Sequence, residues 1–121
     1  MVCTEVFQSK MLLDVGIDAA TADMWWNIEV GGYSNPSCMP VSDADIPAWS
    51  LSALLQLMPK DKDVTWELSY GGWDLNYFQP VEKFFITYET KGSEEIHTEN
   101  SDNPVSAVFK MIVWLKEQKK I

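Results

Sequence analysis

Apolar residues recur every three or four positions in three separate stretches of the chain, the spacing that puts them on one face of an α-helix. The first predicted helix runs from a Thr4 cap to Gly16. The second follows a Ser50 cap, and the third begins at an Asn103 cap with a proline at its first helical position. The apolar faces of these helices are expected to supply core residues Phe7, Met11, Leu51, Leu54, Leu55, Val108, Ile112 and Leu115.

Elsewhere the pattern changes to strict alternation, which is typical of strands that bury one face. Alternation is clear in residues 24–30, 64–70 and 83–90, and residues 94–99 are expected to pair antiparallel after a turn at Gly92. Gly31 and Gly32 suit a tight hairpin turn, and the return through residues 33–41 holds two prolines, so it is at best a short edge strand. These strands are predicted to add core residues Trp26, Ile28, Trp66, Leu68, Phe84 and Ile86.

The order of these elements predicts a single α+β domain over residues 1–121. A mainly antiparallel sheet, made of a hairpin plus a three-strand meander, is expected to pack with about three helices, because short connections cannot cross over to a parallel neighbour. Residues 24–33 and 64–73 align without a gap at an offset of 40, with the tryptophans and the glycine pairs in register. This alignment leaves open whether the chain contains an internal repeat or two hairpins with the same turn chemistry.

Composition and charge exclude several classes of partner. The chain has 121 residues, 46% of them hydrophobic, and its nine basic residues are all lysines, against eighteen carboxylates, for a net charge of −9. Nucleic acid should be repelled, since phosphate and base recognition depend on arginine forks and basic patches. No apolar run approaches the length of a membrane span and no basic leader precedes an apolar segment, so a cytoplasmic protein without a membrane partner is expected.

Candidate chemistry is sparse. Cys3 and Cys38 have no metal-ligand spacing and are expected to be reduced thiols. His97 would share a strand face with Glu95 and Glu99. Such a row is normally solvated and would hold a divalent metal ion only weakly. There is no nucleophile motif and no phosphate-binding loop. We therefore expect no catalytic residue, no cofactor and no metal, so the protein is not expected to be an enzyme.

The unusual feature of the sequence is the number of aromatic residues that fall outside the predicted core positions. Alternation places Trp25 on the face opposite Trp26, the mostly polar face of its strand. Six aromatic residues fall off the predicted core stripes or in turns, namely Trp25, Tyr33, Trp49, Trp73, Tyr77 and Phe78. Either a second layer buries several of them, or they form an interface, since surface tryptophan and tyrosine are enriched in binding hot spots. The interface hypothesis places its anchor at Trp25, beside Tyr33 and Trp73 if the two hairpins are neighbours.

Three blocks, "GIDAATADMWW", "IPAWSLSALLQLMP" and "NPVSAVFKMIVWLKEQKKI", together resemble a family of short uncharacterised proteins of gut bacteria, often in phage or other mobile-element neighbourhoods. The most specific pieces are residues 21–25, 47–51 and 103–115. The resemblance implies a phage-related origin and a cytoplasmic setting. The family carries no established activity, so it transfers no catalytic residue.

These observations predict a non-enzymatic protein–protein interaction module, acting on a protein partner or on a second copy of itself. One alternative is an acidic nucleic-acid mimic that blocks a host DNA-binding protein, although its carboxylates would need a regular stripe and here they are scattered. The other alternative is a small enzyme whose carboxylates converge from distant strands and form no recognisable motif.

Overall fold

The computed structural model describes residues 2–27, 36–92 and 94–121. Its helices are α1 (Val6–Asp14), α2 (Leu51–Gln56) and α3 (Pro104–Glu117), with a 3-10 turn at Ala19–Thr21. Its strands are β1 (Met24–Trp26), β2 (Pro36–Ser37), β3 (Ile46–Ala48), β4 (Val64–Tyr70), β5 (Trp73–Asp74), β6 (Gln79–Pro80), β7 (Phe84–Thr90) and β8 (Glu95–Ser101). None of the helices in these ranges is long and apolar enough to cross a membrane.

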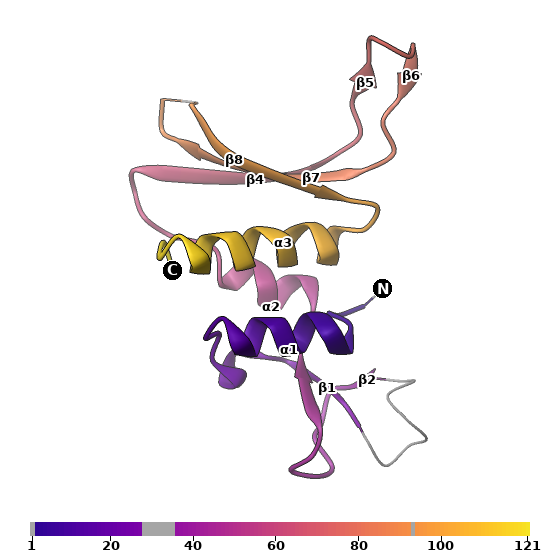
Figure 1. Cartoon of the computed structure of the whole chain (residues 1–121), viewed down its shortest axis with the longest axis vertical. Helices are drawn as coiled ribbons and strands as arrows, with labels where there is room; N and C mark the ends of the chain where they lie inside the picture. The colour runs from indigo at the N-terminus through magenta and orange to yellow at the C-terminus, as the bar shows by residue number, and fades with distance from the viewer. Residues whose placement is uncertain (1, 28–35, 93) are drawn as a thin grey trace.

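All strand pairs described are antiparallel, in three groups with the orders β2-β1-β3, β4-β7-β8 and β5-β6. The α+β class and the meander of β4, β7 and β8 are therefore confirmed. Figure 1 shows the groups stacked along the long axis of the molecule. The β2-β1-β3 sheet lies at one end, the three helices follow, and the β4-β7-β8 sheet lies beyond α3 with the β5–β6 pair projecting from it.

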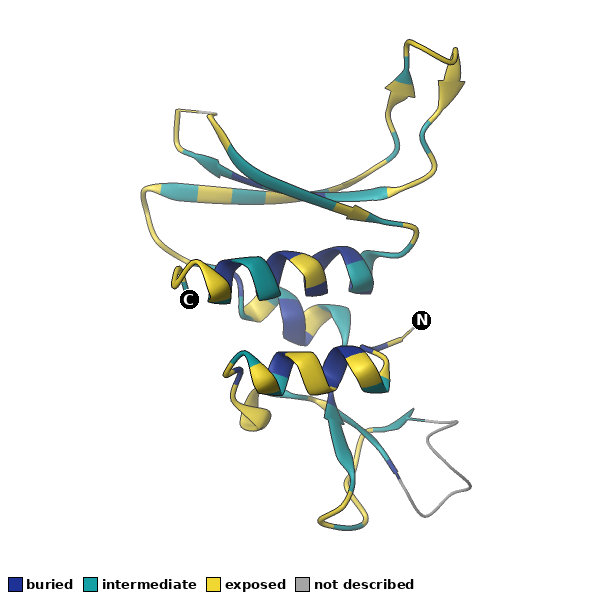
Figure 2. Ribbon diagram, in the orientation of Figure 1, coloured by how far each residue is buried: buried dark blue, intermediate teal, exposed yellow. Residues whose placement is uncertain are grey.

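The main core surrounds α3, with residues of α1 and α2 on one side and the β4-β7-β8 sheet on the other. The Asn103 side chain accepts a hydrogen bond from the Ser106 amide at 2.8 Å, so the predicted cap and the proline after it start α3 as expected. Val108, Ile112 and Leu115 are fully buried. From the sheet, Ile86 is buried, and Trp66, Leu68 and Phe84 are partly buried and pack against the same cluster. The dark blue turns of α3 in Figure 2 mark its buried residues.

The second helix is shorter than its apolar pattern but begins where predicted. Ser50 caps α2 by accepting from the Ala53 amide at 3.2 Å. Leu54 is fully buried, whereas Leu51 and Leu55 are partly buried and pack against the core. The helix is therefore covered on more than one side, as its nearly all-round apolar pattern indicates.

The first helix buries a different face from the predicted one. Phe7 is 58% exposed and Met11 is 43% exposed, so the prediction that both belong to the core is wrong. The buried positions are Gln8, Ser9 and Leu12, of which two are polar. The apolar spacing alone predicts that the Phe7 face is buried. The face that is buried instead carries Gln8 and Ser9, which form hydrogen bonds with neighbouring segments.

A buried polar network explains this orientation. The hydroxyls of Thr4 and Ser9 lie 2.7 Å apart, and Thr4 Oγ1 accepts from the Trp49 amide at 3.1 Å. Gln8 Nε2 donates to Ser106 Oγ on α3 at 3.0 Å. Buried polar groups that are paired in this way stabilise one arrangement of the core. Thr4 is thus a buried partner in the core, and the cap position of α1 belongs to Glu5.

The end of α1 follows the prediction. Gly16 has φ +98°, the left-handed conformation that glycine adopts without strain. Its amide donates to the Leu13 carbonyl at 3.0 Å, and the Ile17 amide donates to the Leu12 carbonyl at 2.9 Å, which is the Schellman pattern. Ile17 is buried and supplies the apolar contact that accompanies this cap.

The small sheet differs from the predicted hairpin. Of the strand predicted over residues 24–30, the structure describes residues 24–27, and the first three form β1. Ile28 and the Gly31–Gly32 turn lie outside the described residues. The return includes β2 at the sheet edge, as expected, but β3 on the other side of β1 was not predicted because its central residue is Pro47. Trp26 is only half-buried, and its indole N–H donates to the Thr4 carbonyl at 2.9 Å.

Candidate interaction surface

The β5–β6 pair forms an arm, residues 73–80, that continues the β4 and β7 strands beyond the three-stranded sheet (Figure 1). At its base, Gly71 and Gly72 have φ values of +88° and +131°, which side-chain-bearing residues rarely adopt. The Gly71 amide donates to the Lys83 carbonyl at 2.9 Å, and the Val81 amide donates to the Gly72 carbonyl at 3.1 Å. Two cross-strand hydrogen bonds therefore join the arm to the sheet, and the register shifts by one residue between the β4–β7 pair and the β5–β6 pair.

The tip of the arm holds an aromatic residue in a strained conformation. Asp74 Oδ1 accepts from the Asn76 amide at 2.9 Å and begins the turn. Phe78 then has φ +52°, a left-handed conformation that costs a residue with a side chain about 1–2 kcal/mol. Its side chain is 79% exposed, so burial within this chain does not offset that cost. Such backbone strain is common where a side chain must be presented to a ligand or partner.

Large apolar side chains are concentrated on the arm. Trp73, Leu75, Tyr77 and Phe78 fall within six consecutive residues, and their exposed fractions run from 58% to 79%. The arm is mostly yellow in Figure 2 for this reason. Single exposed apolar residues are ordinary on protein surfaces, but a contiguous group marks a contact site. Sequence reasoning identified the three aromatic members but missed Leu75, which could have been found as the apolar residue between them in a turn.

A groove of about 750 Å³ lies between the base of the arm and the sheet. Its lining mixes charged, polar and apolar side chains and includes Asp74, Gln79, Glu82, Lys83, Phe85 and Asn100. Phe85 and Asn100 are paired across β7 and β8 and point away from the side covered by α3. The groove therefore begins at Asp74 and Gln79, the arm residues that follow Trp73 and Phe78 in the sequence, and its mixed lining suits the rim of an interface.

The structure does not bring Trp25, the predicted anchor, and Trp73 together. Trp25 is half-buried in β1, where it pairs with Ser37 and Pro47. Trp73 is on the arm, at the opposite end of the molecule (Figure 1), so the condition on which Trp25 and Trp73 would share an interface is not met. The three helices lie between the two sheets and separate them. Tyr33 lies outside the described residues.

The remaining unplaced tryptophan belongs to the core. Trp49 is fully buried, and its indole N–H donates to Thr21 Oγ1 at 3.0 Å. It immediately precedes the Ser50 cap, where an apolar residue commonly packs back onto the helix. That position is the signal that separates Trp49 from the exposed aromatics of the arm.

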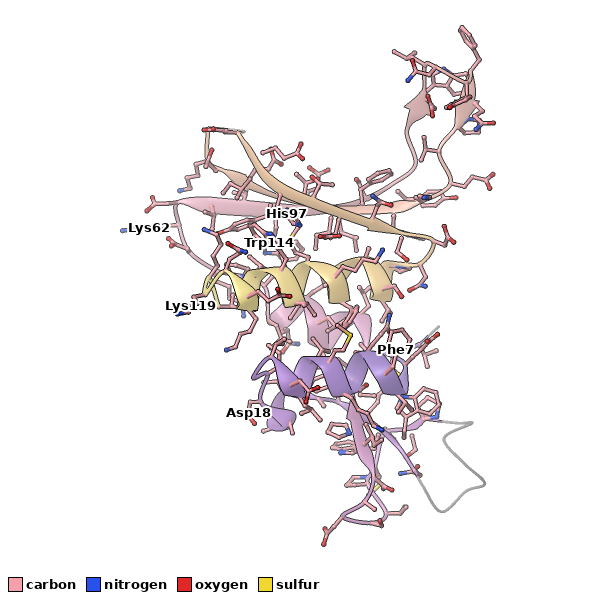
Figure 3. All side chains as sticks on the ribbon, viewed as in Figure 1. Phe7, Asp18, Lys62, His97, Trp114 and Lys119 are labelled. Atoms are coloured by element: carbon pink, nitrogen blue, oxygen red, sulfur yellow. The ribbon has the colours of Figure 1, made fainter. Side chains whose placement is uncertain are left out.

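His97 faces α3 rather than solvent. Its ring stacks on Trp114 with centroids 4.0 Å apart and planes 2° apart, and its Nε2 lies 2.6 Å from Glu99 Oε2 (Figure 3). The predicted row with Glu95 is wrong, because the register shifts between Tyr88 and Glu89 and turns Glu95 away. Glu95 instead accepts from Thr98 Oγ1 at 2.8 Å. The His97 imidazole contacts one aromatic ring and one carboxylate, and it therefore links β8 to α3.

The titratable groups offer little chemistry. In residues 2–27, 36–92 and 94–121, no three His, Cys, Asp or Glu side chains are placed to hold a metal ion. Burial, with a smaller contribution from Asp23, raises the pKa of the Cys3 thiol to about 11. Cys3 is therefore protonated at neutral pH and is a poor nucleophile and metal ligand. Cys38 is exposed.

Comparisons with models of protein families, with curated proteins and with solved structures found no match to this chain.

Proposed function

We propose that the protein is a non-enzymatic binding module that recognises another protein through its arm. The observation that carries the proposal is the group of four large apolar side chains at residues 73–78, with exposed fractions of 58% or more. A folded chain exposes such a group at a free-energy cost that a partner would remove. The strained conformation of Phe78 supports the same proposal, because it displays a ring that contributes little to folding.

The magnitudes are sufficient for a specific contact. Covering one large aromatic ring contributes about 2 kcal/mol from the apolar area removed from water. Three rings and Leu75 therefore reach a micromolar affinity once the entropic cost of association is subtracted. The net charge of −9 favours a partner with positive charge around its apolar contact, whose association slows as salt is added.

The biological setting is part of the proposal and has separate support. Its phage or mobile-element origin and its cytoplasmic location are proposed from the resemblance of residues 21–25, 47–51 and 103–115 to proteins of gut-bacterial mobile elements. Nucleic acid and membranes are not proposed as partners, since the chain has no arginine and no basic excess to bind phosphate.

A site-specific photocrosslink tests the proposal. A photoreactive phenylalanine analogue is placed at Tyr77, which is 73% exposed on the arm, and in a matched chain at Phe7, which is 58% exposed on α1. We expect an adduct with another protein from position 77 and none from position 7. A Trp73→Ser substitution in the same chain should remove the adduct.

Two outcomes would contradict the proposal. One is the absence of any position-77 adduct in cells that produce the protein at its natural level. The other is an adduct only with a second copy of this chain, which would make the arm a self-association site.

A further inference from the structure

One edge of the β4-β7-β8 sheet is unprotected. Folded proteins blunt exposed edge strands with prolines, lysines or bulges, because free backbone groups invite pairing with another chain. The β8 edge has such protection: the register shift near Tyr88 bends it, and Lys110 Nζ donates to the Asn100 carbonyl at 2.9 Å. The other edge, β4, runs for 7 residues with a continuous register and contains neither proline nor lysine.

The backbone groups at this open edge can be assigned from two hydrogen bonds. The Gly71 amide donates to the Lys83 carbonyl and the Lys91 amide donates to the Asp63 carbonyl, which marks both pairs as hydrogen-bonded pairs of the β4–β7 ladder. Such pairs alternate along antiparallel strands. The N–H and C=O groups of Trp66, Leu68 and Tyr70 therefore point away from β7, and β4 has no second neighbour among the described strands.

The side chains at the same edge are also incompletely covered. Val64, Trp66 and Leu68 are half-buried on the face towards α3, and Tyr70 is 60% exposed. Directly across the ladder, the β7 residues Ile86 and Tyr88 are buried. Within the part of the chain that the structure describes, this edge has no strand partner and only partial apolar cover, so a strand with apolar residues at alternate positions would complement it.

We propose that a second copy of this chain supplies that strand, with its β4 running antiparallel to the first across a two-fold axis. The β4 pattern is self-complementary, and a two-fold contact closes without growing into a filament. With the axis at Leu68, Trp66 lies opposite the partner's Tyr70 and Glu67 lies opposite the partner's Ser69. An axis at Glu67 would oppose two carboxylates, and an axis at Trp66 would leave Tyr70 beyond the paired strands. The two copies form one six-stranded sheet.

This interface is separate from the arm and responds differently to salt. Each copy carries a net charge of −9, so long-range repulsion opposes the dimer and salt should strengthen it. The contact proposed for the arm should instead weaken with salt. The two proposals can therefore fail independently.

Opposite charge changes at one exposed position test the register. Ser69 and Glu67 are both exposed on the outer face of β4, so substitutions there leave the core intact. In the proposed register, Ser69→Lys places two lysines opposite the partner carboxylates at position 67, and Ser69→Glu places two carboxylates there. We expect a dimer in sedimentation velocity that Ser69→Lys tightens about tenfold and Ser69→Glu weakens about tenfold. Thr65→Lys, which lies opposite a glycine in this register, should change the affinity little.

Three results would overturn the proposal. The first is a chain that stays monomeric at about 1 mM, the weak end of specific affinities. The second is equal dimer affinities for Ser69→Lys and Ser69→Glu. The third is a dimer that Phe78→Asn dissociates, which would assign the contact to the arm. Amide hydrogen exchange provides an independent readout, because the amides of Trp66 and Leu68 should gain protection as the protein concentration rises.

Discussion

Replacing Phe78 by asparagine should stabilise the protein, although it removes a large apolar residue. Phe78 has φ +52° at the tip of the arm and a side chain that is 79% exposed. Asparagine accepts the left-handed conformation more easily than phenylalanine, because its short polar side chain can bond locally. The substitution Phe78→Asn therefore relieves most of a strain of about 1–2 kcal/mol.

The opposing loss is small. With about a fifth of the ring covered, the lost burial costs roughly 0.5 kcal/mol of the 2 or so that a fully buried phenylalanine contributes. The free energy of unfolding should then rise by about 1 kcal/mol, which raises the melting temperature by about 4 °C for a domain of this size. Binding of the partner proposed for the arm should fall at the same time, so stability and affinity should change in opposite directions.

Tyr77→Asn provides the matched control. Tyr77 is 73% exposed in the same turn, and it is not among the described residues with positive φ. The Tyr77→Asn variant should lose affinity for the partner proposed for the arm without gaining stability. Urea denaturation of both variants, followed by far-UV circular dichroism, gives the comparison. If Phe78→Asn is less stable than the wild type, or if both variants gain equally, the argument that Phe78 is strained and uncovered is refuted.

Three further predictions concern the core. Between pH 9 and 11 the folded state keeps the Cys3 proton while the unfolded state loses it, because burial raises the pKa of the thiol from 9.0 to about 11. This contribution to stability is complete below pH 9 and is lost as the pH rises towards 11. Cys3→Ala should therefore flatten the alkaline stability profile. His97→Ala should cost about 1 kcal/mol through the lost ring stack, whereas Glu95→Ala should be near neutral by the same urea titration. Leu12→Ala should cost about 3 kcal/mol and Phe7→Ser less than about 0.5 kcal/mol, and the reverse order would restore the Phe7 face to the core.

The elements that could be predicted are those whose local signals agree with one another. The third helix has a cap, a proline and an apolar face that all indicate the same start and the same buried side, and Asn103, Ile112 and Leu115 behave as expected. Strands β4 and β7 alternate over seven residues each, long enough to determine which side is buried. The glycine cap at Gly16 depends only on residues close to it in the sequence, so it was predictable too.

The elements that could not be predicted depend on partners distant in the sequence. Phe7 and Met11 have ideal helical spacing, but the face of α1 that turns inward is selected by Trp49 and Ser106, far along the chain. The position of Trp73 relative to Trp25 depends on which sheet each hairpin joins, and alternation contains no information on that. Trp49 and the aromatic residues of the arm all fall outside the core pattern, and the one local signal that separates them is the position of Trp49 directly before the Ser50 cap.

The hydrogen bond between Gly71 and Lys83 closes the β4–β7 ladder beneath the arm, so the arm is an insertion in a pair of strands that is already complete. Its four large side chains lie outside the core cluster. If the arm binds a partner as proposed, selection for folding and selection for recognition act on different residues of the same chain. A lineage could then change what the arm recognises, through substitutions or through the length of the insertion, while the packing of α3 on its sheet stays as it is. Divergence among relatives should be fastest in the eleven or so positions between the two ladder residues, where the mutational cost to stability is lowest.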